Sequence, residues 1–398
     1  MGTACLAVQL RPVEFSMNAK VAIYQNTLTG GGRIRVVNEI IRLLNQLGIV
    51  PDVFSLRVSR TFMKEAGLRF RLVKLPAYVL GLYEVKIIAL NRMMCRYAAH
   101  YNLFINSNNC LVAAPKKVAT IAYVHFPREA RIASKYMNLA FPDGRRVDQA
   151  NPLYKSYRVF LDMLRRRSVL GANIKIVSNS QFSKDRLLEV YPQLPPSSIP
   201  VIYPPVTYST IAQQESERRN VVCTLGRFSP DKRQMEQIEI ARTLPDVQFE
   251  IMGFVGDRAS RRYHSRCQQF VSNQRIKNVT LLPNLTSQQV AERLATARFC
   301  MHNLRNEPFG ISTAEAIGVG CIPLVHDSGG QREIVEPDAL RFRDLHDATS
   351  KLKFLMSQKS PNYLTRLQTN LSKFCVAAFE AGFGRLLRES IENGQSGQ

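Results

Sequence analysis

Runs of apolar residues alternate along this 398-residue chain with segments in which apolar positions recur at helical spacing. The first clear example is a strand pattern at 20–26, which a glycine-rich turn at 27–32 separates from an amphipathic helix pattern at 33–48. Strands that are apolar throughout and that alternate with helices are typical of a parallel sheet covered on both faces. The pattern therefore predicts an α/β protein with doubly wound sheets.

The same plan occurs in both halves of the chain. In the first half we expect further strands at 51–56, 103–106, 120–126 and 173–180. In the second half we expect strands at 221–226, 247–253, 279–283, 298–303 and 321–327. Two Rossmann-like domains follow from this repetition, and a chain of this length is too long for one ordinary core. In such sheets ligands bind at the carboxyl ends of the strands, so we expect the site in a cleft between the facing domains.

A proline-rich run at 192–206 and a polar segment at 209–220 indicate the linker between the domains. We therefore assign an N-terminal domain to 20–208 and a C-terminal domain to 209–398, a division that allows the last helix to pack back on the N-terminal domain. Residues 1–19 are too weakly apolar for a signal peptide, and we expect a disordered leader there. Met17 is an alternative start.

Composition and charge narrow the classes of protein. No stretch of 18 apolar residues is free of charge, so we expect no transmembrane helix. The eight cysteines are scattered without a CxxC pair, which favours a reducing, cytoplasmic compartment over a disulfide framework or a zinc site. The formal net charge is +23, and residues 1–200 carry 29 basic against 11 acidic side chains while residues 201–398 carry 25 against 20. This asymmetry predicts an anionic partner for the first half: a membrane surface, a phosphorylated acceptor or nucleic acid.

The segment 306–335 holds the strongest candidate site. Glu307 lies in a loop after a predicted strand, and Gly310 leads into a helix whose first turn is 311–313. Backbone amides at such a turn favour a phosphate, and glycine lets the backbone approach a ligand. Glu315 lies about one turn into the helix and can share a ligand with Glu307, and 327–330 forms another tight loop at the same edge. Two carboxylates with these amides suit a polyhydroxylated, phosphate-bearing ligand.

A second candidate segment is LGRFSPDKRQ at 225–234. Ser229 and Pro230 are typical of an N-cap and a first helical residue, which places Lys232 in the first helical turn. Arg227 and Lys232 then converge at the carboxyl end of a strand, where a planar guanidinium and a compact ammonium suit a diphosphate. A surface cluster without function is the alternative for a chain this basic.

Two weaker signals lie in the first half. The glycines at 30–32 open the helix that faces the expected cleft, although the run is not a GxGxxG motif. His125 ends a predicted strand, where a structural histidine is the alternative to a functional one. The remaining histidines show no ligand spacing, so we expect no metal site.

These segments together resemble the family-4 glycosyltransferases, which have the GT-B fold of two Rossmann-like domains. The resemblance runs from about Lys20 to beyond Val335. Its most specific parts are the run from Glu307 to Glu315, with seven residues between the two glutamates, and the Gly329-Gly330 loop. Three further segments match: Gly226-Arg227 with Lys232, SNSQFSKDR at 178–186, and VIYPPV at 201–206. Within the family the sequence of these motifs is most similar to the lipid-linked-oligosaccharide α-1,2-mannosyltransferase type. The sequence departs from that type in showing no N-terminal membrane helix and in carrying a basic stretch at 128–167, which leaves the acceptor open.

The resemblance implies that a nucleotide-diphospho-sugar co-substrate binds mainly to the C-terminal domain. Arg227 and Lys232 would hold the diphosphate and stabilise it as it leaves. Glu315 would bind the ribose hydroxyls, and Glu307 would bind the transferred hexose together with the backbone amides of Phe309, Gly310 and Ile311. Gly31 and Gly32 would close over the phosphates from the N-terminal side.

The resemblance also implies the catalytic set and the chemistry. His125 would lie near the sugar and the acceptor and would act together with Glu307, Arg227 and Lys232. Enzymes of this family retain the anomeric configuration and need no metal or other cofactor. The donor that the resemblance favours is GDP-mannose, with a lipid-linked or glycan acceptor. A UDP-sugar donor with a soluble acceptor and a non-catalytic partner that binds nucleotide-sugars are the alternatives.

On the acceptor side, the basic and apolar stretch at 68–97 suits docking on anionic lipid headgroups. Its candidate contacts are Arg69, Arg71 and Lys74, and a core helix with a solvated basic face is the alternative. Arg165, Arg166 and Arg167 could bind an acceptor phosphate or a lipid surface, or could form a solvated helix end. Recognised nucleic-acid modules and stacking aromatics are missing, so we expect no nucleic-acid partner. The sequence thus predicts a cytoplasmic enzyme that is peripheral on a membrane.

Overall fold

The computed structural model describes residues 19–28, 31–63, 67–75, 92–109, 116–127, 173–207, 218–358 and 363–395, together with isolated positions between 111 and 169. The chain divides into two compact units. The first unit comprises Met1–Lys135, Pro152–Pro205 and Lys373–Gln398, and the second comprises Tyr136–Asn151 and Val206–Ser372. The predicted leader up to residue 18, Gly30, Arg165–Arg167 and the linker residues 208–217 lie outside the described residues.

The first unit is built on a six-stranded sheet in the order β5-β3-β1-β6-β7-β8. Its strands are β1 (Val21–Tyr24), β3 (Asp52–Ser55), β5 (Arg71–Lys74), β6 (Leu103–Asn106), β7 (Ala119–Val124) and β8 (Ile174–Ser178). Every neighbouring pair is parallel. Numbered along the sheet, this is the doubly wound order 3-2-1-4-5-6, which brings the carboxyl ends of all six strands to one edge.

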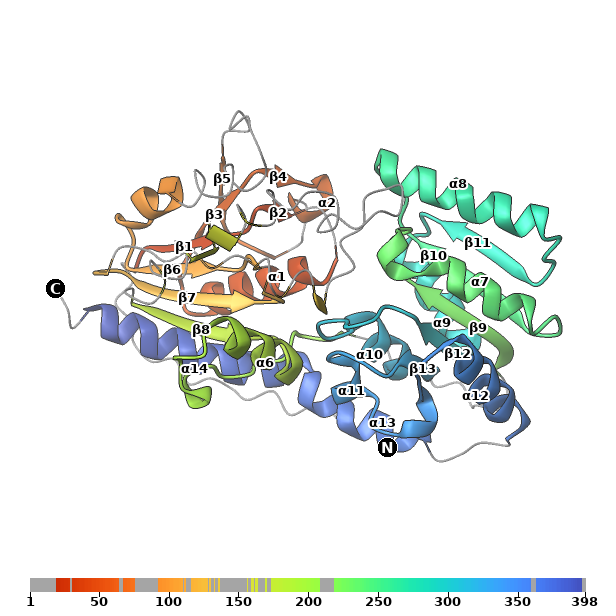
Figure 1. The fold of residues 1–398 in the computed structure, drawn as a ribbon. Coiled ribbons are helices and arrows are strands. Elements are labelled where there is room, and N and C mark those ends of the chain that lie inside the picture. The colour runs from red at the N-terminus through yellow and green to blue at the C-terminus, as the bar shows by residue number, and fades with distance from the viewer. Residues whose placement is uncertain are drawn as a thin grey trace. The chain divides into compact units, whose positions relative to one another are not determined.

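Two helices distant in sequence complete the core of the first unit. They are α1 (Gly32–Gln46) and α14 (Val376–Gln395), which pack against each other, and α14 also packs against β7 (Figure 1). Phe379, Phe383 and Leu387 of α14 are buried among the side chains of the sheet and of α1. For this reason the segment Lys373–Gln398 is part of the first unit, which is the packing of the last helix that the predicted division at 209 allowed.

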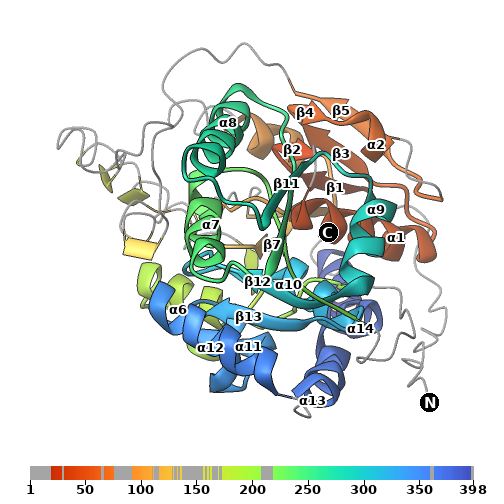
Figure 2. The same ribbon diagram turned by 90° about the vertical axis from the view of Figure 1, so that its right-hand side faces the viewer.

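The second unit repeats the same sheet order, β11-β10-β9-β12-β13-β14, with parallel neighbours throughout. Its strands are β9 (Arg219–Leu225), β10 (Gln248–Gly253), β11 (Val279–Pro283), β12 (Ala297–His302), β13 (Ile322–His326) and β14 (Arg341–Phe342). Its main helices are α7 (Gln234–Arg242), α8 (Arg258–Asn273), α9 (Ser287–Thr296), α10 (Ile311–Gly318), α11 (Gln331–Ile334), α12 (Leu345–Ser357) and α13 (Tyr363–Asn370). Figure 2 shows α7 and α8 on one side of this sheet and α9 on the other.

In the two six-stranded sheets the strands predicted from apolar runs are all confirmed, whereas β5 and β14 were missed. Both lie at sheet edges and are only four and two residues long. Short edge strands carry polar and charged residues, so they show no apolar run. Within the basic and apolar stretch at 68–97, residues 71–74 form β5, and residues 76–91 lie outside the described part, so docking on lipid stays a prediction.

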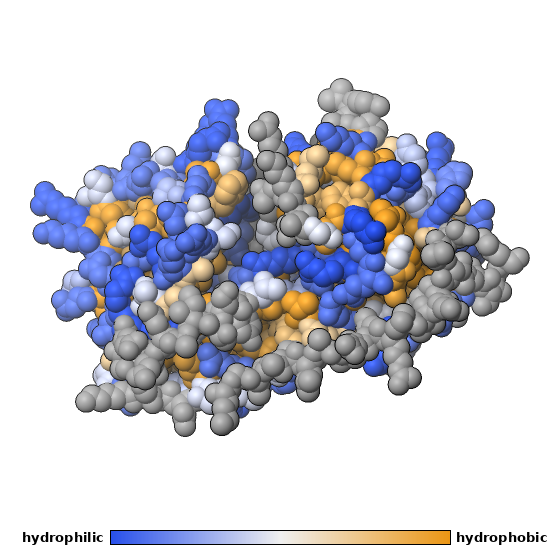
Figure 3. Space-filling model, turned by 180° about the vertical axis from the view of Figure 1, so that it is seen from behind, coloured by the Kyte–Doolittle hydropathy of each residue, from blue (hydrophilic) through white to orange (hydrophobic). Residues whose placement is uncertain are grey.

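The surface and the cysteines follow the composition. Hydrophilic side chains dominate the face shown in Figure 3, with smaller apolar patches between them. Among the described cysteines, Cys223, Cys267, Cys300 and Cys321 are free thiols and are buried. Among the helices that the structure describes, none has the length and apolar character needed to cross a bilayer.

Candidate functional site

The adjacent strands β9 and β12 define the switch point of the second sheet. From β9 the chain continues to β10 on one side, and from β12 it continues to β13 on the other. A crevice at the carboxyl ends of such a strand pair is where ligands of doubly wound sheets bind. Lys232 follows β9 and Glu307 follows β12, and Lys232 Nζ lies 2.8 Å from Glu307 Oε2. The two candidate residues thus meet at the predicted edge although 75 positions separate them.

The surroundings of Glu307 keep its carboxylate charged. Burial by itself would raise the pKa of Glu307, but Lys232 and then His302 outweigh burial and hold the pKa below its ordinary value. The side chains of Glu307 and Lys232 are 16% and 26% exposed, so the pair is largely shielded but still reachable from solvent. The arrangement offers a fixed negative charge and a fixed positive charge side by side.

Local structure after β9 directs Lys232 toward this pair. Residues Pro230–Lys232 form a 3₁₀ turn with Ser229 as its N-cap, and α7 begins only at Gln234. The expectation that Lys232 lies in the first turn of an α-helix is therefore corrected to a 3₁₀ turn. The Lys232 stem runs beside Gly226, where a Cβ atom would lie 3.5 Å from Lys232 Cδ.

Arg227 is placed differently from Lys232. Its side chain is exposed and makes no hydrogen bond or ion pair with Lys232 or Glu307. Hydrogen bonds from Ser260 chiefly lower the pKa of Asp257, and Arg227 contributes a smaller lowering, which places its guanidinium near the start of α8. The predicted convergence of Arg227 and Lys232 therefore stays a prediction.

The loop that carries Glu307 is held by the predicted glycine loop after β13. Gly330 donates its backbone N–H to the Glu307 carbonyl at 2.8 Å, and Asn306 donates its backbone N–H to Ser328 Oγ at 2.8 Å. A Cβ atom on Gly329 would lie 2.5 Å from the Glu307 carbonyl oxygen. The glycines therefore position the backbone of Glu307 and are needed for this close approach.

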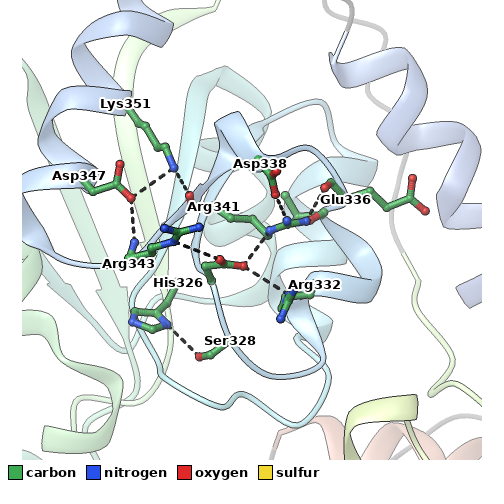
Figure 4. A network of polar contacts seen from close by, with 11 residues as sticks. His326, Ser328, Arg332, Glu336, Asp338, Arg341, Arg343, Asp347 and Lys351 are labelled. Carbon is green, nitrogen blue, oxygen red and sulfur yellow. Dashed lines mark hydrogen bonds and ion pairs between the residues drawn. The ribbon is translucent and has the colours of Figure 1, made fainter.

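The glycine loop is itself anchored by an ion-pair network, drawn in Figure 4. Asp327 Oδ1 accepts from Arg341 Nε at 2.9 Å, and Asp327 also pairs with Arg332 and Arg343. His326 Nδ1 lies 2.8 Å from Ser328 Oγ, and burial, followed by Arg305 and Arg233, lowers the pKa of His326 to about 4. The ring of a neutral His326 can accept a hydrogen bond from the Ser328 hydroxyl. The hydroxyl oxygen can then accept the hydrogen bond from the backbone N–H of Asn306.

The helix after Glu307 begins where the sequence predicts. Gly310 is its N-cap at a φ of 110°, which glycine adopts readily, and Phe309 is buried before it. Gln331 links the helix to the loop, because its Oε1 accepts from Thr313 Oγ1 at 3.1 Å. Its Nε2 donates to the Leu304 carbonyl at 3.3 Å. Ile311 and Glu315 are half-buried on α10, and the structure records no hydrogen bond between Glu315 and Glu307.

The first unit brings its own candidates to the carboxyl edge of its sheet. His125 follows β7, and its Nε2 lies 3.5 Å from Ser107 Oγ after β6. Burial, with a further contribution from Arg33, lowers the pKa of His125 to about 3, so the ring is neutral at physiological pH. Gly31, at a φ of 86°, is the N-cap of α1, and Gly32 is its first residue.

The three described basic candidates on the acceptor side differ in their contacts. Arg71 donates from Nε and Nη2 to the buried Asp52 carboxylate, at 2.6 Å and 2.5 Å. Arg69 and Lys74 have exposed side chains. All three side chains are therefore exposed, and Arg71 differs in having a structural partner.

His302 was not singled out from the sequence. It is the last residue of β12, it is 6% exposed, and its Nε2 lies 3.5 Å from Glu307 Oε2. Burial and then Lys232 lower the pKa of His302 to about 4, so the ring is neutral. Its position at the end of a strand beside the switch point is the signal that could have found it.

Comparisons with known proteins give a family match and several distant relatives. Residues 209–359 match the family described as "Glycosyl transferases group 1". The chain is 21% identical over 252 residues to the GDP-Man:Man(3)GlcNAc(2)-PP-Dol alpha-1,2-mannosyltransferase of Dictyostelium discoideum, covering 57% of this chain and 48% of that protein. It is 24% identical over 278 residues to the Neurospora crassa protein of the same name, covering 59% and 49%. The chain spans about half the length of these curated relatives.

The structure is similar to Anabaena HepE, solved in complex with UDP and glucose, with a TM-score of 0.70 and 14% identity over 93% of this chain and 99% of that one. With its two parallel-sheet units, the chain has the GT-B fold of glycosyltransferases. Residues 209–359 match the glycosyl transferases group 1 family, which confirms the resemblance seen in the sequence.

Proposed function

We propose that the chain is a glycosyltransferase that moves mannose from GDP-mannose to a lipid-linked or glycan acceptor. The observation that carries the proposal is the Lys232–Glu307 pair at the switch point of the second unit. A glutamate whose carboxylate stays charged can accept hydrogen bonds from sugar hydroxyls, and an adjacent ammonium can bind a phosphate. The relatives in Dictyostelium discoideum and Neurospora crassa are named as mannosyltransferases that use GDP-mannose, which supports this choice of donor.

In this mechanism the leaving diphosphate is stabilised by fixed positive charge. Lys232 holds its ammonium in a partly shielded position, and Arg227 adds an exposed guanidinium at the same edge of the sheet. Electrostatic stabilisation of a leaving group is often the largest contribution to catalysis. We further propose that transfer retains the anomeric configuration and requires no metal. Within the described residues no group of three or more histidine, cysteine, aspartate or glutamate side chains is arranged to hold a metal ion.

We also propose that the first unit meets an anionic membrane surface near the acceptor. Residues 1–200 carry most of the net positive charge, and Arg69 and Lys74 are exposed. Val159, Phe160 and Met163 are exposed large apolar side chains, at 51%, 52% and 43%. Apolar side chains next to basic residues are typical of interfacial docking.

The donor is tested first by thermal unfolding with GDP, UDP, ADP and their common sugar derivatives. A ligand that binds only the folded state stabilises it by about 2.7 kcal/mol at a hundredfold excess over its dissociation constant. A rise in Tm with GDP and GDP-mannose supports the proposal. A rise with UDP-sugars alone moves the donor to UDP, and no rise with any nucleotide overturns the proposed function.

Catalysis is then tested with Glu307→Ala, Arg227→Ala and Lys232→Ala in a transfer assay with the donor that binds. Each variant should lose most of its turnover. Lys277→Ala is the matched control because Lys277 is exposed and precedes β11 at the opposite edge of the sheet. Near-normal turnover in all three variants would overturn the mechanism. Donor binding without transfer to any lipid-linked or soluble acceptor would favour a non-catalytic sugar-nucleotide-binding protein.

A further inference from the structure

We propose that His302 is a positioning residue that fixes the Glu307 carboxylate through one oxygen and leaves the other oxygen for a sugar hydroxyl. This inference rests on the proposed function for the identity of the ligand. The contacts that carry it converge on a single atom. Glu307 Oε2 lies 2.8 Å from Lys232 Nζ and 3.5 Å from His302 Nε2.

The second carboxylate oxygen is free of such contacts. Within the described chain, the contacts of the Glu307 carboxylate with Lys232 and His302 both involve Oε2, and Oε1 accepts no hydrogen bond and is not buried. Oε1 therefore faces solvent at the switch point. A carboxylate whose one oxygen is held by two groups presents its other oxygen in a fixed direction, which is the requirement for recognising one hydroxyl.

The chemistry of the pair decides where the His302 proton lies. Burial keeps the imidazole neutral, so the ring has one N–H. A charged carboxylate can only accept, so an unprotonated Nε2 would bring two acceptors together. The other ring nitrogen, Nδ1, is buried and has no hydrogen-bond partner in the described chain. Glu307 therefore favours the tautomer with the proton on Nε2, which donates toward Oε2.

The fold holds His302 in this position with little freedom. It is the last residue of β12, paired in register with β13, and its side chain is 6% exposed. It lines a small pocket with the neighbouring Asn303 and with Gln237, whose side chains are 1% and 4% exposed and also retain buried polar atoms without partners. A distance of 3.5 Å is long for a hydrogen bond, and contacts of this kind in active sites commonly tighten as substrate binds.

The test compares binding of GDP and GDP-mannose to the wild type, His302→Ala, His302→Gln, Glu307→Ala and the double variant His302→Ala with Glu307→Ala. His302→Ala should weaken GDP-mannose binding about tenfold, as for one hydrogen bond to a charged group, and should change GDP binding much less. His302→Gln, whose amide can donate from a similar position, should restore part of the loss. The effect of His302→Ala should vanish when Glu307 is already alanine.

Equal losses for GDP and GDP-mannose, or additive losses in the double variant, would overturn the positioning role.

A second measurement needs no ligand. Nitrogen-15 NMR of the histidine rings should show His302 as the neutral tautomer protonated on Nε2 at pH 7, assigned by its disappearance in His302→Gln. A proton on Nδ1 would overturn the proposal. If neither nucleotide binds the wild type, the proposed function fails, and the NMR result still decides the contact.

Discussion

The backbone N–H of Gly330 donates to the backbone carbonyl of Glu307, 2.8 Å away, and so ties the loop after β13 to the loop after β12. A Cβ atom on Gly330 would lie 2.2 Å from the Pro308 carbonyl oxygen, closer than any side chain allows. We therefore expect Gly330→Ala to move the Glu307 loop, lowering Tm and abolishing the Tm rise given by the donor. Calorimetry with and without nucleotide measures both effects.

The control for this substitution is Gly382→Ala, in α14. A Cβ atom there would make only ordinary contacts with Ile202, at 3.5 Å and beyond. Because alanine is the better helix former, Gly382→Ala should raise stability by roughly 0.5–1 kcal/mol and leave donor binding unchanged. If the Gly330→Ala variant binds the donor as tightly as the wild type does, the glycine loop does not position Glu307.

Removing Lys232 should change how stability depends on pH. In the wild type the pKa of Glu307 is lowered, so its charge stabilises the fold above the unfolded pKa and this contribution is lost as the pH falls. In Lys232→Ala burial would dominate and raise the Glu307 pKa, so the variant should lose stability as the pH rises. The gap in unfolding free energy should reach at most about 3 kcal/mol near neutral pH.

Urea unfolding at pH 5, 6, 7 and 8 measures this gap. Lys277→Ala, an exposed lysine removed from the same unit, should show no comparable pH dependence. A constant gap for Lys232→Ala across the range would mean that Lys232 does not govern the charge of Glu307.

Glu39 makes the first unit sensitive to pH. Burial chiefly, with a further contribution from Glu380 of α14, raises its pKa from 4.5 to about 7 although Arg42 opposes this. A raised pKa means that the folded state keeps a proton that the unfolded state loses, so stability falls as the pH rises from about 4.5 to about 7. Glu39→Gln removes this loss, which is on the order of 3 kcal/mol.

The Tm of Glu39→Gln relative to wild type should therefore be higher at pH 8 than at pH 5. Glu389→Gln is the matched control, since Glu389 is half exposed and pairs with Lys175 at 2.9 Å. An equal Tm difference at both pH values for Glu39→Gln would show that Glu39 titrates normally.

The basic residues at the edge of the first sheet should separate into two roles. Arg71 contacts the buried Asp52, so Arg71→Ala should lower Tm, and because its side chain is 76% exposed the variant should also lose the vesicle binding due to one surface charge. Replacing both Arg69 and Lys74 by alanine should leave Tm unchanged and weaken binding to phosphatidylserine vesicles by roughly fivefold per charge. Sedimentation at two salt concentrations measures the binding, which should weaken at high salt.

Lys277→Ala combined with Lys353→Ala removes two exposed charges from the second unit and serves as the charge-matched control. If this control lowers vesicle binding as much as the Arg69 and Lys74 variant does, then net charge drives the binding and the edge of the first sheet has no special role.

Much of the fold could be predicted from the sequence because the decisive signals are local. A buried parallel strand is apolar over consecutive residues, so β1, β6, β7 and β12 appear directly as apolar runs. The start of α10 at Gly310 and the turn after β9 follow from glycine, serine and proline at particular positions. The edge strands β5 and β14 carry no such run, because their side chains are partly exposed.

The sequence by itself determined which residues stand at strand ends, among them Lys232, Glu307 and Gly330, because helix caps, turns and apolar runs depend on neighbouring residues. Only the tertiary structure decided which of these residues meet. Lys232 reaches Glu307 because β9 pairs with β12 although β10 and β11 lie between them in the sequence, and strand order depends on contacts between distant segments. The same pairing brings His302, one of several strand-end residues, against the Glu307 carboxylate. Likewise, the C-terminal helix α14 is part of the first unit because its apolar side chains are buried against β7 and α1.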